Sequence, residues 1–135
     1  YKILDHQHVP EIRSFLGTLG TAPEIAFVPV SAPVDRGILA TCFVPCDGTV
    51  DATALLEEAY SDQPLIRLRK QSPELRLVRG TAFADIAAFR QNGTVAVICA
   101  IDNLGRGAAS QAVQSLELAL DLNGPSPLLA APILP

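Results

Sequence analysis

The sequence predicts an α+β fold, a mostly antiparallel mixed sheet with helices on one face. Short apolar, β-branched segments bounded by Pro, Gly and Asn are more numerous than segments with helical periodicity. The strongest local signal lies at 86–101, where Asn92-Gly93 joins two apolar arms and predicts a hairpin with a two-residue turn. Because the second arm, 94–101, is apolar on both faces, we expect it to be a central strand of the sheet.

The segments before this hairpin predict two helices and four strands. Pro10 suits the first turn of a helix because its missing N–H would be unpaired there, and Asp51 is a typical N-cap for the second helix. We expect Leu55, Leu56 and Ala59 of that second helix to face the core. The expected elements are a helix starting at 10 and ending near 17, strands over 26–30 and 38–44, a helix over 51–60, and strands over 65–68 and 75–78.

A last helix is expected after the hairpin, over 107–120. Its apolar residues follow helical spacing and predict a buried stripe of Ala109, Val113, Leu116 and Leu120. The prolines that follow predict an extended tail over 125–135. We therefore expect residues 1–124 to form one catalytic and dimerisation domain.

Composition excludes several classes of protein. The chain has 135 residues, of which 49% are apolar and 18% are charged, so it is not a disordered chain. No apolar run approaches the length that a membrane-spanning helix needs, and a net charge of −4 disfavours nucleic acid as a partner. Three cysteines are too few for a disulfide scaffold and favour the reducing cytoplasm. The absence of Met suggests a part of a longer protein.

His6, His8 and Glu11 are the one cluster of titratable groups in the sequence. If residues 5–9 are extended, both imidazoles point to one side and Glu11 reaches back to one of them. A carboxylate on one ring nitrogen suits an acid–base histidine. The residue count also fits a metal site with two His and one carboxylate, and the third possibility is a pair of exposed loop histidines.

Gly105-Arg106-Gly107 follows a predicted strand and opens a helix, as in loops that bind dinucleotide phosphates. No second strand completes a βαβ unit, and the third glycine position is Ser110, so the resemblance to a nucleotide loop is weak. Asp102 and Asn103 can still border a ligand that another part of the molecule holds. None of the three cysteines has the surroundings of a nucleophile.

Three segments in order along the chain resemble the N-acetyl-gamma-glutamyl-phosphate reductase family. The first is His6-Gln7-His8-Val9-Pro10-Glu11-Ile12, and the second joins Phe27-Val28-Pro29 to Arg36-Gly37-Ile38-Leu39. The third is Ala100-Ile101-Asp102-Asn103-Leu104 with the Gly107-Ala108-Ala109 helix start. This resemblance implies the fold of the C-terminal domain of the glyceraldehyde-phosphate-dehydrogenase group.

The resemblance also implies a function in arginine biosynthesis. Such enzymes reduce an acyl phosphate to a semialdehyde with NADP, through a nucleophilic Cys that precedes the His-x-His motif. This chain would then be the second half of a homodimer or homotetramer, inactive without the N-terminal nucleotide-binding half that carries the Cys and most of the NADP site. A related aspartate-semialdehyde dehydrogenase is disfavoured by the His-x-His-x-Pro-Glu-Ile run.

By position in the motifs, the resemblance implies a role for each candidate residue. His6 is the acid–base group, and His8, Glu11 and Arg36 orient it or hold the substrate. Asp102 and Asn103 approach the cofactor. Two alternatives remain, a non-catalytic interaction domain of the same fold and a metal-binding domain built on the histidines and Glu11.

Overall fold

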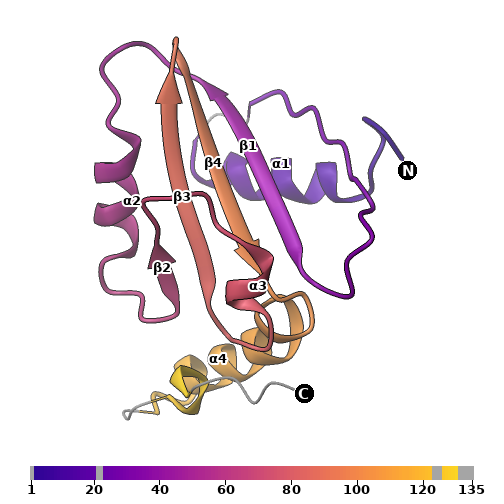
Figure 1. Ribbon diagram of the computed structural model, residues 1–135, viewed down its shortest axis with the longest axis vertical. Coiled ribbons are helices and arrows are strands. Elements are labelled where there is room, and N and C mark those ends of the chain that lie inside the picture. The colour runs from indigo at the N-terminus through magenta and orange to yellow at the C-terminus, as the bar shows by residue number, and fades with distance from the viewer. Residues whose placement is uncertain (1, 21–22, 123–125, 131–135) are drawn as a thin grey trace. The chain divides into compact units, whose positions relative to one another are not determined.

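A computed structural model describes residues 2–20, 23–122 and 126–130. The chain divides into two compact units, residues 1–34 and 35–135 (Figure 1). No helix among the described residues is long and apolar enough to cross a membrane.

The first unit is built around helix α1 (His8–Thr18). This helix begins two residues earlier than the sequence predicts, so His8 lies in its first turn and the extended conformation expected for 5–9 is wrong. The strand predicted over 26–30 is also wrong, because this segment is not assigned to any strand. Its Phe27 carbonyl accepts a hydrogen bond from the Leu4 backbone N–H at 3.0 Å.

The second unit is a four-stranded mixed sheet in the order β1-β4-β3-β2. Its strands are β1 (Ile38–Pro45), β2 (Ile66–Leu68), β3 (Ala84–Gln91) and β4 (Thr94–Ile101). The predicted hairpin is confirmed: β3 and β4 pair antiparallel, and Asn92 and Gly93 both have positive φ, 49° and 74°. β1 pairs antiparallel with β4, and β2 pairs parallel with β3. The α+β class and the central position of β4 are therefore confirmed.

Helix α2 (Ala52–Tyr60) confirms the capping prediction, since the Asp51 side chain accepts hydrogen bonds from the backbone N–H groups of Thr53 and Ala54. The helix contacts β3 and β2. Its half-buried face contains Ala52, Leu56 and Tyr60. Leu55 is 55% exposed and Ala59 is also exposed, so the inward positions expected for these two residues are wrong, and the one expected for Leu56 is confirmed.

The segment predicted as a strand over 75–78 forms the short helix α3 (Leu75–Val78). Its alternation of apolar and charged residues is typical of a strand, but four residues are too few for periodicity to separate a strand from one helical turn. Val78 is fully buried. Helix α3 therefore contributes to the core without joining the sheet.

The last helical segment consists of a π-helical turn, η1 (Gly105–Ala109), and helix α4 (Ser110–Ala119). Its predicted buried stripe is exposed: Val113, Leu116 and Leu120 are 41%, 57% and 59% exposed. The side that meets its own chain is polar, with Arg106 donating to Gln114 and Ser126 donating to Glu117. Of the predicted tail, the described part forms a short 3-10 turn, η2 (Pro127–Leu129), and the remainder lies outside the described residues.

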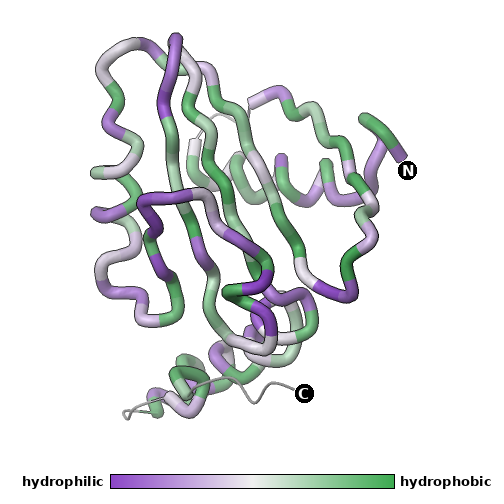
Figure 2. Tube along the Cα trace, in the orientation of Figure 1, coloured by the Kyte–Doolittle hydropathy of each residue, from purple (hydrophilic) through white to green (hydrophobic). Residues whose placement is uncertain are grey.

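Strand β1 lies at an edge of the sheet, and all eight of its residues are exposed. Figure 2 shows that much of β1 and β4 is hydrophobic. Among the large apolar side chains of β1, Leu39 is 52% exposed and Phe43 is 72% exposed. Exposed apolar side chains along an edge strand are typical of an interface with another protein chain.

Candidate active-site residues and a cleft beside Arg36

His6 is the buried member of the histidine pair. It is 8% exposed, and its ring centroid lies 5.0 Å from that of Phe27 and 4.8 Å from that of His8. Its Nδ1 accepts a hydrogen bond from the His8 backbone N–H at 3.3 Å. The neutral ring therefore carries its proton on Nε2. Burial lowers the pKa of His6 below its usual 6.5, and the charges of His8 and Lys2 lower it further.

Glu11 pairs with His8. The His8 Nδ1 lies 2.8 Å from a Glu11 carboxylate oxygen, and both side chains are largely exposed. The sequence predicted that Glu11 would contact one of the two imidazoles, and in the structure it contacts that of His8. In the described part of the chain, no group of three or more His, Cys, Asp and Glu side chains is placed to hold a metal ion.

In the second unit, the fully buried side chain of Asp102 joins three segments. Its Oδ2 accepts from the Arg36 guanidinium, with Nε at 2.8 Å, and from the Gly80 backbone N–H at 2.6 Å. Its Oδ1 accepts from the backbone N–H groups of Leu104 and Gly105, both at 2.9 Å. These last two bonds occupy the start of the η1–α4 helix, which the sequence suggested as a phosphate-binding loop.

The electrostatic result is a carboxylate that stays ionised inside the protein. Burial by itself would raise the pKa of Asp102, but the hydrogen bonds from Gly80, Gly105, Arg36 and Leu104 lower it to about 2. The negative charge is shared among several donors, so the Arg36 guanidinium is only one of its partners.

Asn103 and Gly105 fix the chain on either side of Leu104. The Asn103 Oδ1 accepts from the Gly37 backbone N–H at 2.7 Å. A Cβ on Gly105 would lie 2.7 Å from the Thr81 carbonyl oxygen, so this position has no room for a side chain. The structure thus brings Arg36 together with the adjacent pair Asp102 and Asn103, which lie far from it in the sequence.

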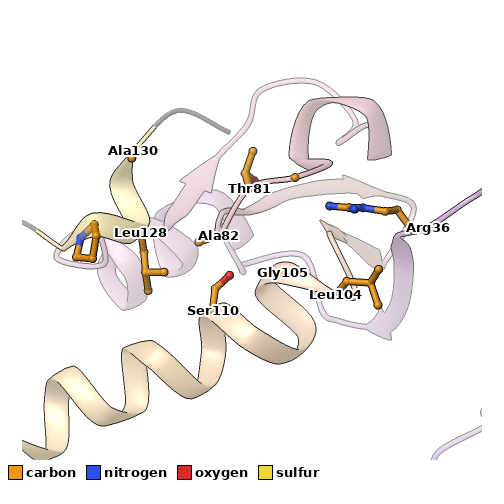
Figure 3. Close-up of a pocket in the computed structure, with 10 residues that line it drawn as sticks. Arg36, Thr81, Ala82, Leu104, Gly105, Ser110, Leu128 and Ala130 are labelled. Carbon is orange, nitrogen blue, oxygen red and sulfur yellow. The ribbon is translucent and has the colours of Figure 1, made fainter. Parts of the chain in front are cut away.

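A cleft of about 380 Å³ lies beside this group of residues (Figure 3). Arg36 and Leu104 lie at one end, Leu128 and Ala130 lie at the other, and the Ser110 hydroxyl points between them. The lining residues are Arg36, Gly80, Thr81, Ala82, Leu104, Gly105, Ser110, Pro127, Leu128 and Ala130. Its volume is in the range of sites that take small molecules.

Sequence reasoning missed Gly80, Thr81 and Ser110 as members of this site. Gly80 has a positive φ of 71° and donates to Asp102. A glycine followed by a hydroxyl residue is a common turn pattern, so this pair carries no signal by itself. Ser110 was noted only because it replaces the third glycine of a nucleotide loop.

Comparison with known proteins identifies the family of the chain. The family model of the semialdehyde dehydrogenase dimerisation domain matches residues 1–103. The N-acetyl-gamma-glutamyl-phosphate reductase of Wolinella succinogenes is 42% identical over 123 residues, which are 90% of this chain and 36% of that protein.

Two further relatives carry the same name. The Pelodictyon phaeoclathratiforme protein is 40% identical over 130 residues, which cover 91% of this chain and 39% of that protein. The Methanocaldococcus jannaschii protein is 40% identical over 124 residues, with 87% and 36% covered. The chain thus spans less than two-fifths of the length of these relatives. Since the family model matches most of the chain, the chain belongs to the semialdehyde dehydrogenase dimerisation-domain family.

Proposed function

We propose that this chain is the second half of a cytoplasmic, NADP-dependent N-acetyl-gamma-glutamyl-phosphate reductase of arginine biosynthesis. The observation that carries the proposal is the likeness, at about 40% identity over nearly the whole chain, to proteins of that name. The three cysteines are free thiols, in keeping with a reducing compartment. The nucleophilic Cys and most of the NADP site would belong to the N-terminal half.

His6 is proposed as the acid–base group. In the reduction, the Cys sulfur displaces phosphate from the acyl phosphate, and hydride transfer to the thioester carbon leaves an oxyanion. With its proton on Nε2, His6 would donate a hydrogen bond to this oxygen and share the proton with it until the carbon–sulfur bond breaks and the semialdehyde leaves. Its Nδ1 accepts from the His8 backbone N–H, so Nε2 is the nitrogen that would exchange the proton. His8 and Glu11 would orient this part of the chain.

Asp102 and Asn103 are proposed to border the cofactor as positioning residues. The Asp102 oxygens already accept from Arg36 and from backbone N–H groups, so this carboxylate suits holding the loop better than touching a ligand. The Asn103 amide and the 57%-exposed Leu104 side chain are the groups that would meet a nicotinamide ring. When bound, the cofactor supplies the hydride.

Strand β1 is proposed as part of the interface between two copies of the chain, in a homodimer or homotetramer. The family is described as a dimerisation domain, and β1 is the strand whose eight residues are all exposed. An apolar edge strand of this kind is an aggregation hazard unless a partner covers it.

The exposed apolar side of α4 is proposed to contact the N-terminal half. The dimerisation-domain match ends at residue 103, before this helix begins, and the relatives contain much further sequence. Leu116 and Leu120 of this side are more than half exposed, while the polar side meets its own chain. A helix with this arrangement favours a second apolar surface as its neighbour.

The test is to mix this chain with a separately expressed N-terminal half. The assay follows the phosphate-dependent oxidation of N-acetylglutamate semialdehyde with NADP. We expect activity only in the mixture, and a fall of about 10²- to 10⁴-fold with His6→Ala. Gln7→Ala, which changes the exposed neighbour of the two histidines, is the matched control.

Two results would contradict this function. Unchanged turnover with His6→Ala would remove the acid–base assignment. A stable complex of the two halves without any turnover would make the chain an interaction domain of the same fold, which is the second candidate function.

A further inference from the structure

A buried carboxylate on β3 holds an arginine on β2. Asp85 is fully buried, and its Oδ1 accepts a hydrogen bond from the Nε of Arg67, the residue opposite it in the parallel pairing of the two strands. The Cζ of Arg67 also lies 4.5 Å from the centroid of the Phe83 ring. Since a buried carboxylate is stable only when it is paired, Asp85 retains this guanidinium, and the aromatic ring restricts its orientation.

The same guanidinium binds helix α3. Its Nη2 donates to the Leu77 carbonyl at 2.9 Å. α3 has four residues, and the carbonyls at the end of so short a helix have no partners within it. A helix of one turn also has little stability of its own. The position of α3 therefore depends on contacts such as the one from Arg67 and on the burial of Val78.

The segment of α3 contacts the surroundings of Arg36 at two places. The Gly80 backbone N–H, just after the helix, donates to Asp102 Oδ2 at 2.6 Å, and this oxygen also accepts from Arg36. Within the helix, Leu75 packs against Gly37, the residue that follows Arg36: a Cβ on Gly37 would lie 2.8 Å from the Leu75 Cδ2. A movement of α3 would therefore disturb both the carboxylate that holds Arg36 and the backbone beside it.

We propose that Arg67 is a positioning residue for Arg36 and acts on it through α3. Asp85 fixes the guanidinium of Arg67, which holds α3 at Leu77. The helix then places the Gly80 N–H on the carboxylate that orients Arg36. Arginine suits this role because its planar fork donates to two acceptors in fixed directions, here a carboxylate and a carbonyl. These contacts do not depend on which reaction the protein catalyses.

The experiment follows single amide signals of the full-length protein by NMR. Three arginines of this chain precede a glycine, in Arg36-Gly37, Arg79-Gly80 and Arg106-Gly107. Arginine labelled with ¹³C at its carbonyl and glycine labelled with ¹⁵N therefore select the amides of Gly37, Gly80 and Gly107 in this chain. Arg79→Lys, which removes the labelled carbonyl and keeps the charge, assigns the Gly80 signal. The Gly107 N–H donates to the Asp102 backbone carbonyl at 2.8 Å and is the internal control.

The main variant is Arg67→Lys, which keeps the positive charge beside Asp85 but loses the planar fork. We expect the Gly80 amide to exchange with solvent about tenfold faster and to lose part of its downfield shift, because its hydrogen bond to Asp102 weakens. The Arg36 Nε–H, followed in a sample with ¹⁵N at the arginine Nε, should also exchange faster, and Gly107 should not change. Arg67→Met, which removes both hydrogen bonds, should have the larger effect, and Arg67→Lys remains the test if the Met variant does not fold.

Arg69→Lys is the matched control. The Arg69 Nε lies 3.4 Å from Oδ2 of the same carboxylate, Asp85, and Arg69 makes no side-chain hydrogen bond to α3 in the described part of the chain. This variant should therefore leave the Gly80 and Arg36 signals as they are in the wild type.

Three results would overturn the positioning role. The first is a Gly80 or Arg36 signal that stays unchanged in both Arg67 variants. The second is an equal change in Arg69→Lys, which would mean that the charge near Asp85 matters and the bond to Leu77 does not. The third is an equal acceleration at Gly80 and Gly107, which would mean a general loss of stability. The expected changes in a protein without reductase activity would support the role of Arg67 and contradict only the proposed function.

Discussion

At the scale of single residues, Asp102 has the largest expected effect on stability. Asp102→Asn removes the charge that pairs with the partly buried Arg36 and is expected to lower the free energy of unfolding by about 3 kcal/mol. Urea denaturation of the two proteins measures this. Asp62→Asn changes an exposed carboxylate with the same chemistry and should change stability little.

The same carboxylate predicts a pH dependence. Its folded-state pKa of about 2 lies below the usual 3.8, so the stabilisation is complete above about pH 4 and is lost as the pH falls toward 2. By the size of the shift, about 2 kcal/mol is involved. Urea midpoints between pH 5 and pH 2 should therefore fall more in the wild type than in Asp102→Asn. Parallel curves for the two proteins would contradict this prediction.

His6 carries a second prediction at this scale. Its pKa lies below 6.5 because the ring is buried and because His8 and Lys2 are near it, so the imidazole loses its proton at a lower pH than an exposed one. His8→Gln removes one positive neighbour and should raise the His6 pKa. NMR titration of the imidazole protons measures both values, and a His6 pKa at or above 6.5 in the wild type would be the contrary result.

At the scale of elements, the η1–α4 helix depends on one glycine. Gly105→Ala would place a Cβ 2.7 Å from the Thr81 carbonyl and is expected to destabilise the protein by about 2 kcal/mol. Gly107→Ala, two residues later, meets its nearest atom at 3.4 Å and should be neutral or slightly stabilising, as alanine favours helices. Thermal denaturation of both variants tests the difference, and equal midpoints would contradict it.

Elements with strong local signals could be predicted from the sequence. The Asn92-Gly93 turn and the Asp51 cap each depend on one residue type in one local conformation. The strands predicted over 26–30 and 75–78 were wrong. A strand also needs a neighbouring strand to pair with, and the local sequence pattern does not show whether one is present. For α4, the spacing correctly predicted a helix with one apolar side, but that side is exposed to solvent in this chain instead of buried.

The candidate site could also be predicted only in part from the sequence. The motifs identified Arg36, Asp102 and Asn103, and the structure brings the three together. Gly80 and Ser110 contribute a backbone donor and a hydroxyl, and such groups become visible only when distant segments meet in space. The pairing of Glu11 with His8 also depended on where α1 begins.

At the scale of the whole molecule, β1 predicts how copies associate. Phe43→Glu places a charge on the 72%-exposed aromatic position of β1 and is expected to dissociate the proposed dimer. Sedimentation velocity measures the mass. Leu55→Glu, at a 55%-exposed position of α2, is the control that should leave the dimer intact. A dimer unaffected by Phe43→Glu would place the interface elsewhere.

The order of the strands has a consequence for biosynthesis. β1 pairs with β4, although β1 ends at residue 45 and β4 begins only at residue 94. The ribosome must therefore translate roughly 50 residues after β1 before β4 begins. At ribosomal rates this takes roughly 3–10 s, whereas a hairpin such as β3–β4 closes in microseconds once it has emerged. We therefore expect the β3–β4 hairpin to fold first and β1, which is synthesised earlier, to pair with β4 afterwards. During those seconds the nascent chain carries an unpaired apolar strand, which is the kind of segment that chaperones at the ribosome bind.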